Sequence, residues 1–364
     1  MLFSQTVNFN GQITGWIAGN PEKSFVSQIG VRYIPDLFIE KTLRDNLFLD
    51  ADISLDMYTS ADIHNWKISQ TSNKFRAYRL WARLSTDRLE TRLGLQKINF
   101  GSAVLFRPLQ WFDRVDPRDP LKITDGVYGL LLRYYFQNNT NIWLWGLYGN
   151  DETKGLEIAP TTQNDIEFGG RVQMPLLTGE AGVTYHHRQA DFSKLSNQHS
   201  DSTASSSVPE NRLGLDGKWD VGVGLWFEGT LIQHKTDIAG LKYQRAFTFG
   251  IDYTFDVGNG LTTIGEHFIS ALADKAFSKG EKSSFTGLSV NYPLGLVDNI
   301  SAILFYDWDN KDWYRTFTWQ RLYDNWSFFL IGFWNPEELL INQNQDSNST
   351  FAGKGIHLMI VYNH

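Results

Sequence analysis

Acidic and basic side chains stand at every second position of several neighbouring segments of this chain. Asp50, Asp52 and Asp56 do so in one segment, and Arg79 and Arg83 do so in the next. Because alternate side chains of a β-strand point to the same face, we expect these rows side by side on one face of a sheet. Such rows around a narrow aqueous space create a transverse field that orients polar solutes. The other members of this predicted pore-lining ladder are Arg88, Glu90, Arg92, Arg133 and Arg171.

Two interpretations of these rows stay open. The charges can line a pore, or they can pair with one another and make a rigid or plugged wall. Rings of arginine are typical of pores that pass anions or phosphate. The formal net charge of −7 argues the other way. A mild preference for anions is therefore one hypothesis that the sequence raises.

The segment 99–124 combines arginine, aspartate and large aromatic side chains with four apolar residues at 103–106. Connections of this length are often functional, and the aromatic content indicates that this one packs on something. If the strands enclose a lumen, we expect the segment to fold into it and to set its constriction. An external lid or a partner-binding surface is the alternative. The candidate constriction residues are Arg107, Trp111, Asp113, Arg114 and Arg118.

Motifs of known enzymes are missing from the sequence. It contains no short motif typical of a zinc protease, a serine hydrolase or a nucleotide-binding loop. His186 and His187 are adjacent, so in a strand they point to opposite faces and cannot bind one ion together. We therefore expect no catalytic residue, no metal and no cofactor.

The elements that must position these residues are β-strands. Alternation of apolar and polar residues recurs along the chain and is clearest at 47–58 and 247–255. It yields about eighteen candidate strands, with sixteen as the other possible count. Aromatic residues make up 15% of the chain and charged residues 20%, as in a barrel that faces lipid outside and water inside. No apolar run is long enough for a membrane-spanning helix. The predicted fold is all-β: one antiparallel up-and-down transmembrane β-barrel domain over 1–364.

The predicted connections alternate in length. Bacterial barrels have long external loops and short periplasmic turns, so this alternation places both termini in the periplasm. The connection 35–45 is the exception, because it is long although its position in the alternation calls for a short turn. A boundary error or a short periplasmic excursion would explain it. The main external loops are 99–124, 191–210 and 335–353, and the other long or polar connections are 60–73, 150–163 and 272–283.

Aromatic residues recur at the expected strand ends, where a membrane-interface belt lies. Examples are Tyr134, Phe136, Tyr253, Phe255 and Tyr362. The tryptophans are more numerous than two belts need, so some of them could form an interface between barrels. These are Trp143, Trp145, Trp313, Trp319, Trp326 and Trp334.

One part of the chain resembles a known pattern. Residues 93–101, followed by 107–113, 116–121 and 126–127, resemble outer-membrane porin-like families, including the phosphate-selective-porin-like and alginate-export-like barrels. In those families a strand is followed by a loop rich in aromatic residues, Pro and Asp, and then by a strand that opens with Gly. The resemblance implies a barrel of 16 or 18 strands that passes anionic or polar solutes.

The function that these observations favour is a porin in the outer membrane of a Gram-negative bacterium, for passive passage of small polar or anionic solutes. The alternative is a structural barrel with a closed lumen that belongs to an outer-membrane complex. The expected partners are outer-membrane lipid, lipopolysaccharide and small polar solutes, with other envelope proteins or a second copy as further candidates. The acidic balance of the chain argues against nucleic acid.

Overall fold

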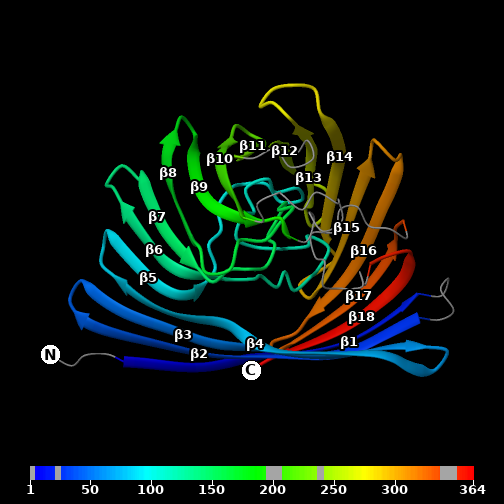
Figure 1. Cartoon of the computed structure of the whole chain (residues 1–364). Helices are drawn as coiled ribbons and strands as arrows, with labels where there is room; N and C mark the ends of the chain where they lie inside the picture. Colours follow the sequence, from blue (N-terminus) through cyan, green and yellow to red (C-terminus); the bar gives the residue numbers. More distant parts are fainter. Residues whose placement is uncertain (1–4, 21–25, 194–206, 236–241, 337–350) are drawn as a thin grey trace.

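The computed structural model describes residues 5–20, 26–193, 207–235, 242–336 and 351–364. Within them, eighteen antiparallel strands form one sheet, and the first strand pairs with the last, which closes the sheet into a barrel (Figure 1). The predicted fold class and the count of eighteen are confirmed. The strands are β1 (Gln5–Asn20), β2 (Val26–Arg44), β3 (Leu47–His64), β4 (Lys67–Ser85), β5 (Leu89–Gln96), β6 (Val127–Tyr135), β7 (Asn141–Tyr148), β8 (Ile166–Leu176), β9 (Gly179–Asp191), β10 (Ser207–Asp220), β11 (Gly224–His234), β12 (Tyr243–Phe255), β13 (Leu261–Ala273), β14 (Glu281–Pro293), β15 (Asp298–Asp307), β16 (Asp312–Leu322), β17 (Trp326–Trp334) and β18 (Lys354–Asn363).

The two faces of the sheet differ as the alternation predicts. On β3, Asp50 and Asp56 are buried on the inner face, whereas Leu49 and Ile53 are exposed on the outer face. Closure pairs the backbone of neighbouring strands, and the exposed outer face is apolar, which together suit a barrel surrounded by lipid. Among the described residues, no helix has the length and apolar character needed to cross a membrane.

The predicted loop 60–73 is wrong. β3 continues to His64 and β4 begins at Lys67, so only Asn65 and Trp66 turn the chain. Both residues have positive φ, 49° and 63°, which is the geometry of a type I′ hairpin turn. The usual second residue of such a turn is Gly, so a Trp at this position concealed the hairpin in the sequence.

The predicted connection 35–45 is also strand for most of its length. β2 runs past Pro35 to Arg44, and its ladder to β1 includes Pro35 opposite Gly11. Proline cannot donate a ladder hydrogen bond and is therefore uncommon in the middle of a strand. The boundary was therefore in error, and only two residues, 45–46, connect β2 to β3.

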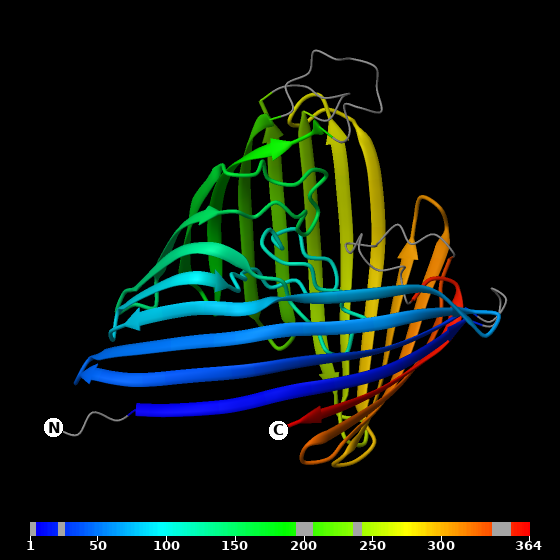
Figure 2. The same ribbon diagram turned by 60° about the horizontal axis from the view of Figure 1, so that its bottom comes forward.

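The first four strands are longer than their neighbours. β1–β4 have 16 to 19 residues, whereas β5–β7 have eight or nine. Figure 2 shows that β1–β4, which form one side of the wall, run at a steep angle to β11–β13. The short β5 pairs with β4 only from Leu80 to Ser85. Residues 67–79 of β4 therefore have no described strand beside them on the β5 side.

The connections fall into two groups at the two ends of the barrel. The turns after even-numbered strands have two to five residues. They lie at the same end of the barrel as the start of β1 and the end of β18. The predicted loops 191–210 and 335–353 follow odd-numbered strands, and most of each, 194–206 and 337–350, lies outside the described residues. β9 extends to Asp191 and β10 begins at Ser207, so the margins of the first loop are strand.

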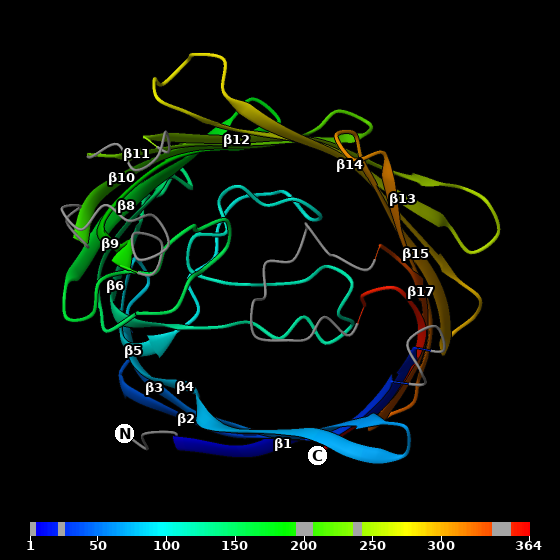
Figure 3. The same ribbon diagram turned by 45° about the vertical axis from the view of Figure 1, so that its right-hand side comes forward.

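The connection between β5 and β6, residues 97–126, leaves the wall and lies inside the ring of strands (Figure 3). We call it the lumen segment. The expected inward folding of 99–124 is therefore observed, and it replaces the alternative of an external lid.

A glycine on the inner face of β2 gives a test of the packing. Trp16 of β1 lies over Gly30 and stacks on Tyr58 of β3, with ring centroids 5.3 Å apart. A Cβ at Gly30 would clash with the indole ring, so we expect Gly30→Val to lower the free energy of unfolding by about 1–3 kcal/mol, the usual cost of overpacking. Thermal unfolding in detergent measures the change. Gly15→Val, where a Cβ would meet nothing within 4 Å, is the control, and an equal loss in both variants would contradict the prediction.

Candidate functional site

Glu266 of β13 binds the tip of the lumen segment. Its carboxylate accepts hydrogen bonds from the backbone N–H groups of Val104, Leu105 and Phe106, at 2.6, 2.9 and 2.8 Å. It also accepts the indole N–H of Trp226 at 2.9 Å. A carboxylate offers about four lone-pair sites, so these four donors use its whole capacity. One buried side chain thus fixes three consecutive amides of the segment.

Glu228 of β11 and Thr248 of β12 bind the same stretch. Glu228 accepts the backbone N–H groups of Ala103 at 2.7 Å and Leu109 at 3.1 Å. The Thr248 hydroxyl donates to the carbonyl of Phe106 at 2.8 Å. Buried backbone groups need hydrogen-bond partners, and a loop inside a barrel has no neighbouring strand to supply them. Side chains of the wall provide these hydrogen bonds instead.

Apolar contacts fix the lumen segment on two sides. Leu105 and Phe106 pack among inner-face side chains of β12–β16, and Phe106 stacks on Phe268 with ring centroids 5.6 Å apart. Phe100 and Trp111 pack against β6 and β7 in a second cluster. The segment therefore reaches from the β6–β7 wall to the β12–β16 wall.

The structure divides the tryptophans that could form an outer interface. Trp143 and Trp145 lie on the inner face of β7 and pack against the lumen segment, so the expectation is wrong for these two. The alternation of β7 allows either face, and the apolar segment inside the barrel decides it. Trp313, Trp326 and Trp334 are exposed on the outside.

Most of the candidate constriction residues are buried within the lumen segment. Trp111 donates to the carbonyl of Pro108 at 3.1 Å, and Asp113 accepts two backbone N–H groups at 2.8 Å each. Arg118 forms an ion pair with Asp116 at 2.6 Å. Arg107 is only partly buried. The charges of this segment thus mainly stabilise its own fold.

Arg114 belongs to a charged cluster at the base of the segment. Its Nε donates to Asp125 at 2.8 Å and its Nη2 to Glu152 at 2.9 Å, and the Nζ of Lys154 lies 3.8 Å from Asp125. Burial tends to raise the pKa of Asp125, but Lys154 and Arg114 outweigh it and hold this pKa below its ordinary value. The opposite holds for Asp113, where burial raises the pKa. A charged Asp125 thus links 97–126 to the connection 149–165.

On the inner face of β2–β4, guanidinium groups cover carboxylates. Arg83 lies 2.6 Å from Asp50, and Arg32 and Arg76 each lie 3.1 Å from Asp56. The three arginine side chains are 30%, 21% and 36% exposed, in that order, whereas those of Asp50 and Asp56 are 3% and 1% exposed. The accessible charge of these ion pairs is therefore positive, although a carboxylate partly neutralises each group. We call β2–β5 the basic wall.

The basic wall continues on β5, with a partner on β6. Arg92 and Arg133 share Glu90, at 2.8 and 3.8 Å. The guanidinium of Arg92 lies 4.6 Å from the ring of Trp81, and that of Arg133 lies 3.8 Å from the ring of Trp143. Cation–π contacts of this kind favour the charged arginine and restrict its orientation.

The remaining members of the predicted ladder lie in different surroundings. Arg88 is exposed in the turn before β5, so its expected place in the inner row is wrong, because the strand begins one residue later. Arg171 is buried and forms an ion pair with Asp216. Asp52 is partly buried on the inner face of β3. Arg79 is buried where β4 and β5 separate.

Two anchors of the lumen segment escaped the sequence reasoning. Glu228 and Glu266 each interrupt a strand that is otherwise rich in apolar and aromatic residues. A lone carboxylate on such an inner face must find hydrogen-bond donors. The isolated glutamates were therefore the signal in the sequence for a contact with another segment. Their donors in the lumen segment lie more than a hundred residues away in the chain.

A buried ion cluster supports the wall of β9–β11. Glu210 accepts from Arg188 at 2.6 Å and from Arg212 at 2.7 Å, and His234 lies 2.8 Å away on its other oxygen. Glu157, from the connection 149–165, pairs with both arginines. The cluster attaches the connection 149–165 to the wall. The charges of the cluster are buried and therefore hardly accessible from the lumen.

The two adjacent histidines point to opposite faces, as expected. His186 is buried beside Glu167 at 3.1 Å, and His187 contacts Asn211 at 2.9 Å. In the part of the chain that the structure describes, no group of three or more His, Cys, Asp or Glu side chains is placed to hold a metal ion.

Comparison with known proteins shows the fold. No family model and no curated protein matches the sequence. Solved structures that resemble it include OccK7 of Pseudomonas aeruginosa, with 10% identity, a TM-score of 0.59 and 99% of this chain and 98% of that chain covered. OccAB1 of Acinetobacter baumannii has 8% identity, a TM-score of 0.57 and coverage of 99% and 95%. OmpT, described as an outer membrane protein of Vibrio cholerae, has 13% identity, a TM-score of 0.52 and coverage of 99% and 100%.

Removing the Glu266 carboxylate should detach the lumen segment. Glu266→Ala leaves buried N–H groups without an acceptor, and each such group costs about 1–3 kcal/mol. We expect trypsin to cut after Arg114 or Arg118 in the folded variant, whereas the native chain resists.

Mass spectrometry of the fragments identifies the cuts. Glu281→Ala, at an exposed site on β14, is the control and should digest like the native protein. Identical protection of Glu266→Ala and the native chain would refute the anchoring role.

Proposed function

We propose that this chain is an outer-membrane channel that passes small polar solutes and prefers anions. The observation that carries the proposal is the difference in exposure on the basic wall. The side chains of Arg32, Arg76 and Arg83 are partly exposed, whereas their partner carboxylates are covered. At these ion pairs, an anion meets a positive group first, whereas a cation must displace an arginine to reach Asp50 or Asp56. Accessible basic groups favour anion passage.

The outer surface supports a membrane location. Its exposed side chains are largely apolar, and exposed aromatic residues, among them Tyr253 and Phe255, lie near the short turns. The shared fold with an outer membrane protein supports the same membrane. We infer outer-membrane lipid and lipopolysaccharide as surroundings and small polar solutes as cargo. The termini, which lie with the short turns, would then face the periplasm.

The lumen segment would act as the constriction of this channel. It lies inside the barrel, contacts opposite walls and is bound by buried carboxylates, so its position is well defined. Residues that remain partly accessible there, such as Arg107, would face the passing solute together with the basic wall.

A structural barrel with a closed lumen is the second candidate. The observation in its favour is that the lumen segment packs on both walls. A closed barrel would gain its role from partners that contact its loops or its exposed tryptophans. The presence or absence of conductance separates the two candidates.

Reversal potentials in planar bilayers under a KCl gradient test the channel. We expect the native chain to give discrete conductance steps with a permeability ratio for chloride over potassium above one. Arg32→Gln, Arg76→Gln and Arg83→Gln combined should lower this ratio to one or below, because the removed charges are the accessible ones.

Arg321→Gln removes one charge near the short turns and serves as the control, with the ratio unchanged. Clear cation selectivity of the native chain would reject the anion preference. Folded protein that gives no conductance, and that purifies with fixed partners, would favour the closed barrel instead.

A further inference from the structure

Arg79 differs from the other buried arginines that the structure describes. Arg114, Arg118, Arg171, Arg188 and Arg212 each lie within ion-pair distance of a carboxylate. Arg79 is 8% exposed, and no described carboxylate lies at that distance. Buried charges are normally paired, because an unpaired one has lost its hydration without compensation. A buried arginine without a countercharge therefore indicates a position for an anion.

The cross-strand register shows why Arg79 has no partner. On β3 and β4, Asp50 lies opposite Arg83 and Asp56 lies opposite Arg76. The residue opposite Arg79 is Ser54. An aspartate at that position would continue the pattern of acid against base, and the chain has a short neutral side chain there.

The contacts of Arg79 are all with neutral groups. Its Nη2 donates to the carbonyl and the hydroxyl of Thr124, and its Nη1 donates to the carbonyl of Tyr78. The guanidinium also lies 4.1 Å from the centre of the Tyr78 ring. These contacts orient the group and include no carboxylate. The nearby carboxylate of Asp52, which lies opposite Trp81, interacts with Arg79 electrostatically but forms no ion pair with it.

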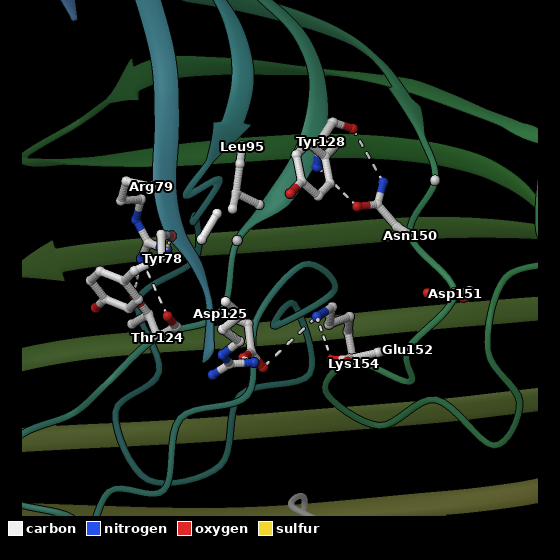
Figure 4. A pocket seen from close by; sticks show the side chains of 14 residues that line it. Tyr78, Arg79, Leu95, Thr124, Asp125, Tyr128, Asn150, Asp151, Glu152 and Lys154 are labelled. Atoms are coloured by element: carbon white, nitrogen blue, oxygen red, sulfur yellow. Dashed lines mark hydrogen bonds and ion pairs between the residues drawn. The ribbon is translucent and has the colours of Figure 1, made fainter. Parts of the chain in front are cut away.

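Arg79 lines a cavity of about 180 Å³ at the place where the wall is incomplete. The ladder between β4 and β5 ends at Leu80 and Leu95, and the chain then turns into the lumen. In Figure 4, Arg79, Tyr78 and Thr124 lie on one side of the cavity, Lys154 and Glu152 lie on the other, and Asp125 lies between them. Of the acids in the lining, Asp125 and Glu152 are already paired with Lys154 and with Arg114, and Asp151 is exposed to solvent.

The shape of the backbone keeps this space open. Gly126 borders the cavity, and a Cβ there would lie 3.2 Å from the Arg79 Nη1 and 3.0 Å from a Leu95 methyl. The lining also includes Leu95 and Tyr128, and Tyr128 is exposed. The cavity thus combines a basic group with apolar and aromatic side chains in its lining.

We propose that this cavity binds an oxyanion, a phosphate or a carboxylate group, against the Arg79 guanidinium. The contacts with Tyr78 and Thr124 use three of the five N–H donors of Arg79, so two donors remain for the oxygens of such a group. The anion supplies the charge that Ser54 does not. It comes either from a free solute or from the head group of an amphiphile whose tail lies along the apolar and aromatic side chains of the lining. The site lies in the wall beside the lumen, and its occupancy does not depend on conductance.

The test uses the full chain folded in a neutral detergent and follows thermal unfolding by tryptophan fluorescence. The probes are inorganic phosphate and dodecyl phosphate below its micelle concentration, with the ionic strength kept constant by chloride. We expect each probe that reaches the site to raise the melting temperature in a saturable manner. Arg79→Gln should lose this response, and Arg321→Gln, the charge-matched control, should keep it.

A second variant keeps the test decisive if Arg79→Gln does not fold. Ser54→Asp places a carboxylate opposite Arg79, so it should raise the melting temperature without any probe and abolish the response. A lower half-saturating concentration for dodecyl phosphate assigns the site to a head group, and equal concentrations assign it to a free oxyanion. Both results support the site. No saturable response of the native chain to either probe, or a full response in folded Arg79→Gln or Ser54→Asp, overturns the proposal.

Discussion

Backbone amides inside the barrel need acceptors, and two buried glutamates provide them. Glu228 and Glu266 bind five N–H groups of the lumen segment between them. Without these acceptors, a loop in this position would leave polar groups unpaired among apolar rings. The placement of Phe100 and Phe106 against opposite walls follows from this attachment. The attachment of the lumen segment therefore also determines which inner-face side chains it covers and which stay accessible.

The ion pairs of Asp50 and Asp56 on the basic wall show how charges can be paired and still present mainly one sign to solvent. A carboxylate is short, so Asp50 and Asp56 remain near the backbone, whereas the longer arginines extend over them toward the lumen. Each pair contributes little net charge, yet its accessible part is positive. Stacking on Trp81 and Trp143 restricts the arginines further along the wall. Formal net charge is therefore a poor guide to the field inside the lumen.

The unequal strand lengths explain the incomplete part of the wall. β4 has 19 residues and β5 has eight, so more than half of β4 has no partner on that side. The lumen segment begins where β5 ends, and its return at Thr124 gives Arg79 its contacts. The segment that lies inside the barrel thus also borders the cavity in the wall.

Much of the fold could be predicted from the sequence, because period-two alternation is a local property. It assigned Asp50 to the inner face and Leu49 to the outer face, and it located eighteen strands with errors mainly at their ends. Local signals failed where a rare residue occupied a familiar position, as Trp66 did in the hairpin turn and Pro35 did within a strand.

The site could be predicted only in part. The sequence by itself determined the strand pattern, the faces of the charged rows and the unusual composition of 99–124, since each depends on neighbouring residues. Tertiary structure decided which charges stay accessible, which acids bind the segment and why Arg79 forms no ion pair. Those properties arise from contacts between distant parts of the chain, such as Glu266 with Phe106 and Arg79 with Thr124. Alternation places a side chain on a face, and only the packed barrel determines what lies against it.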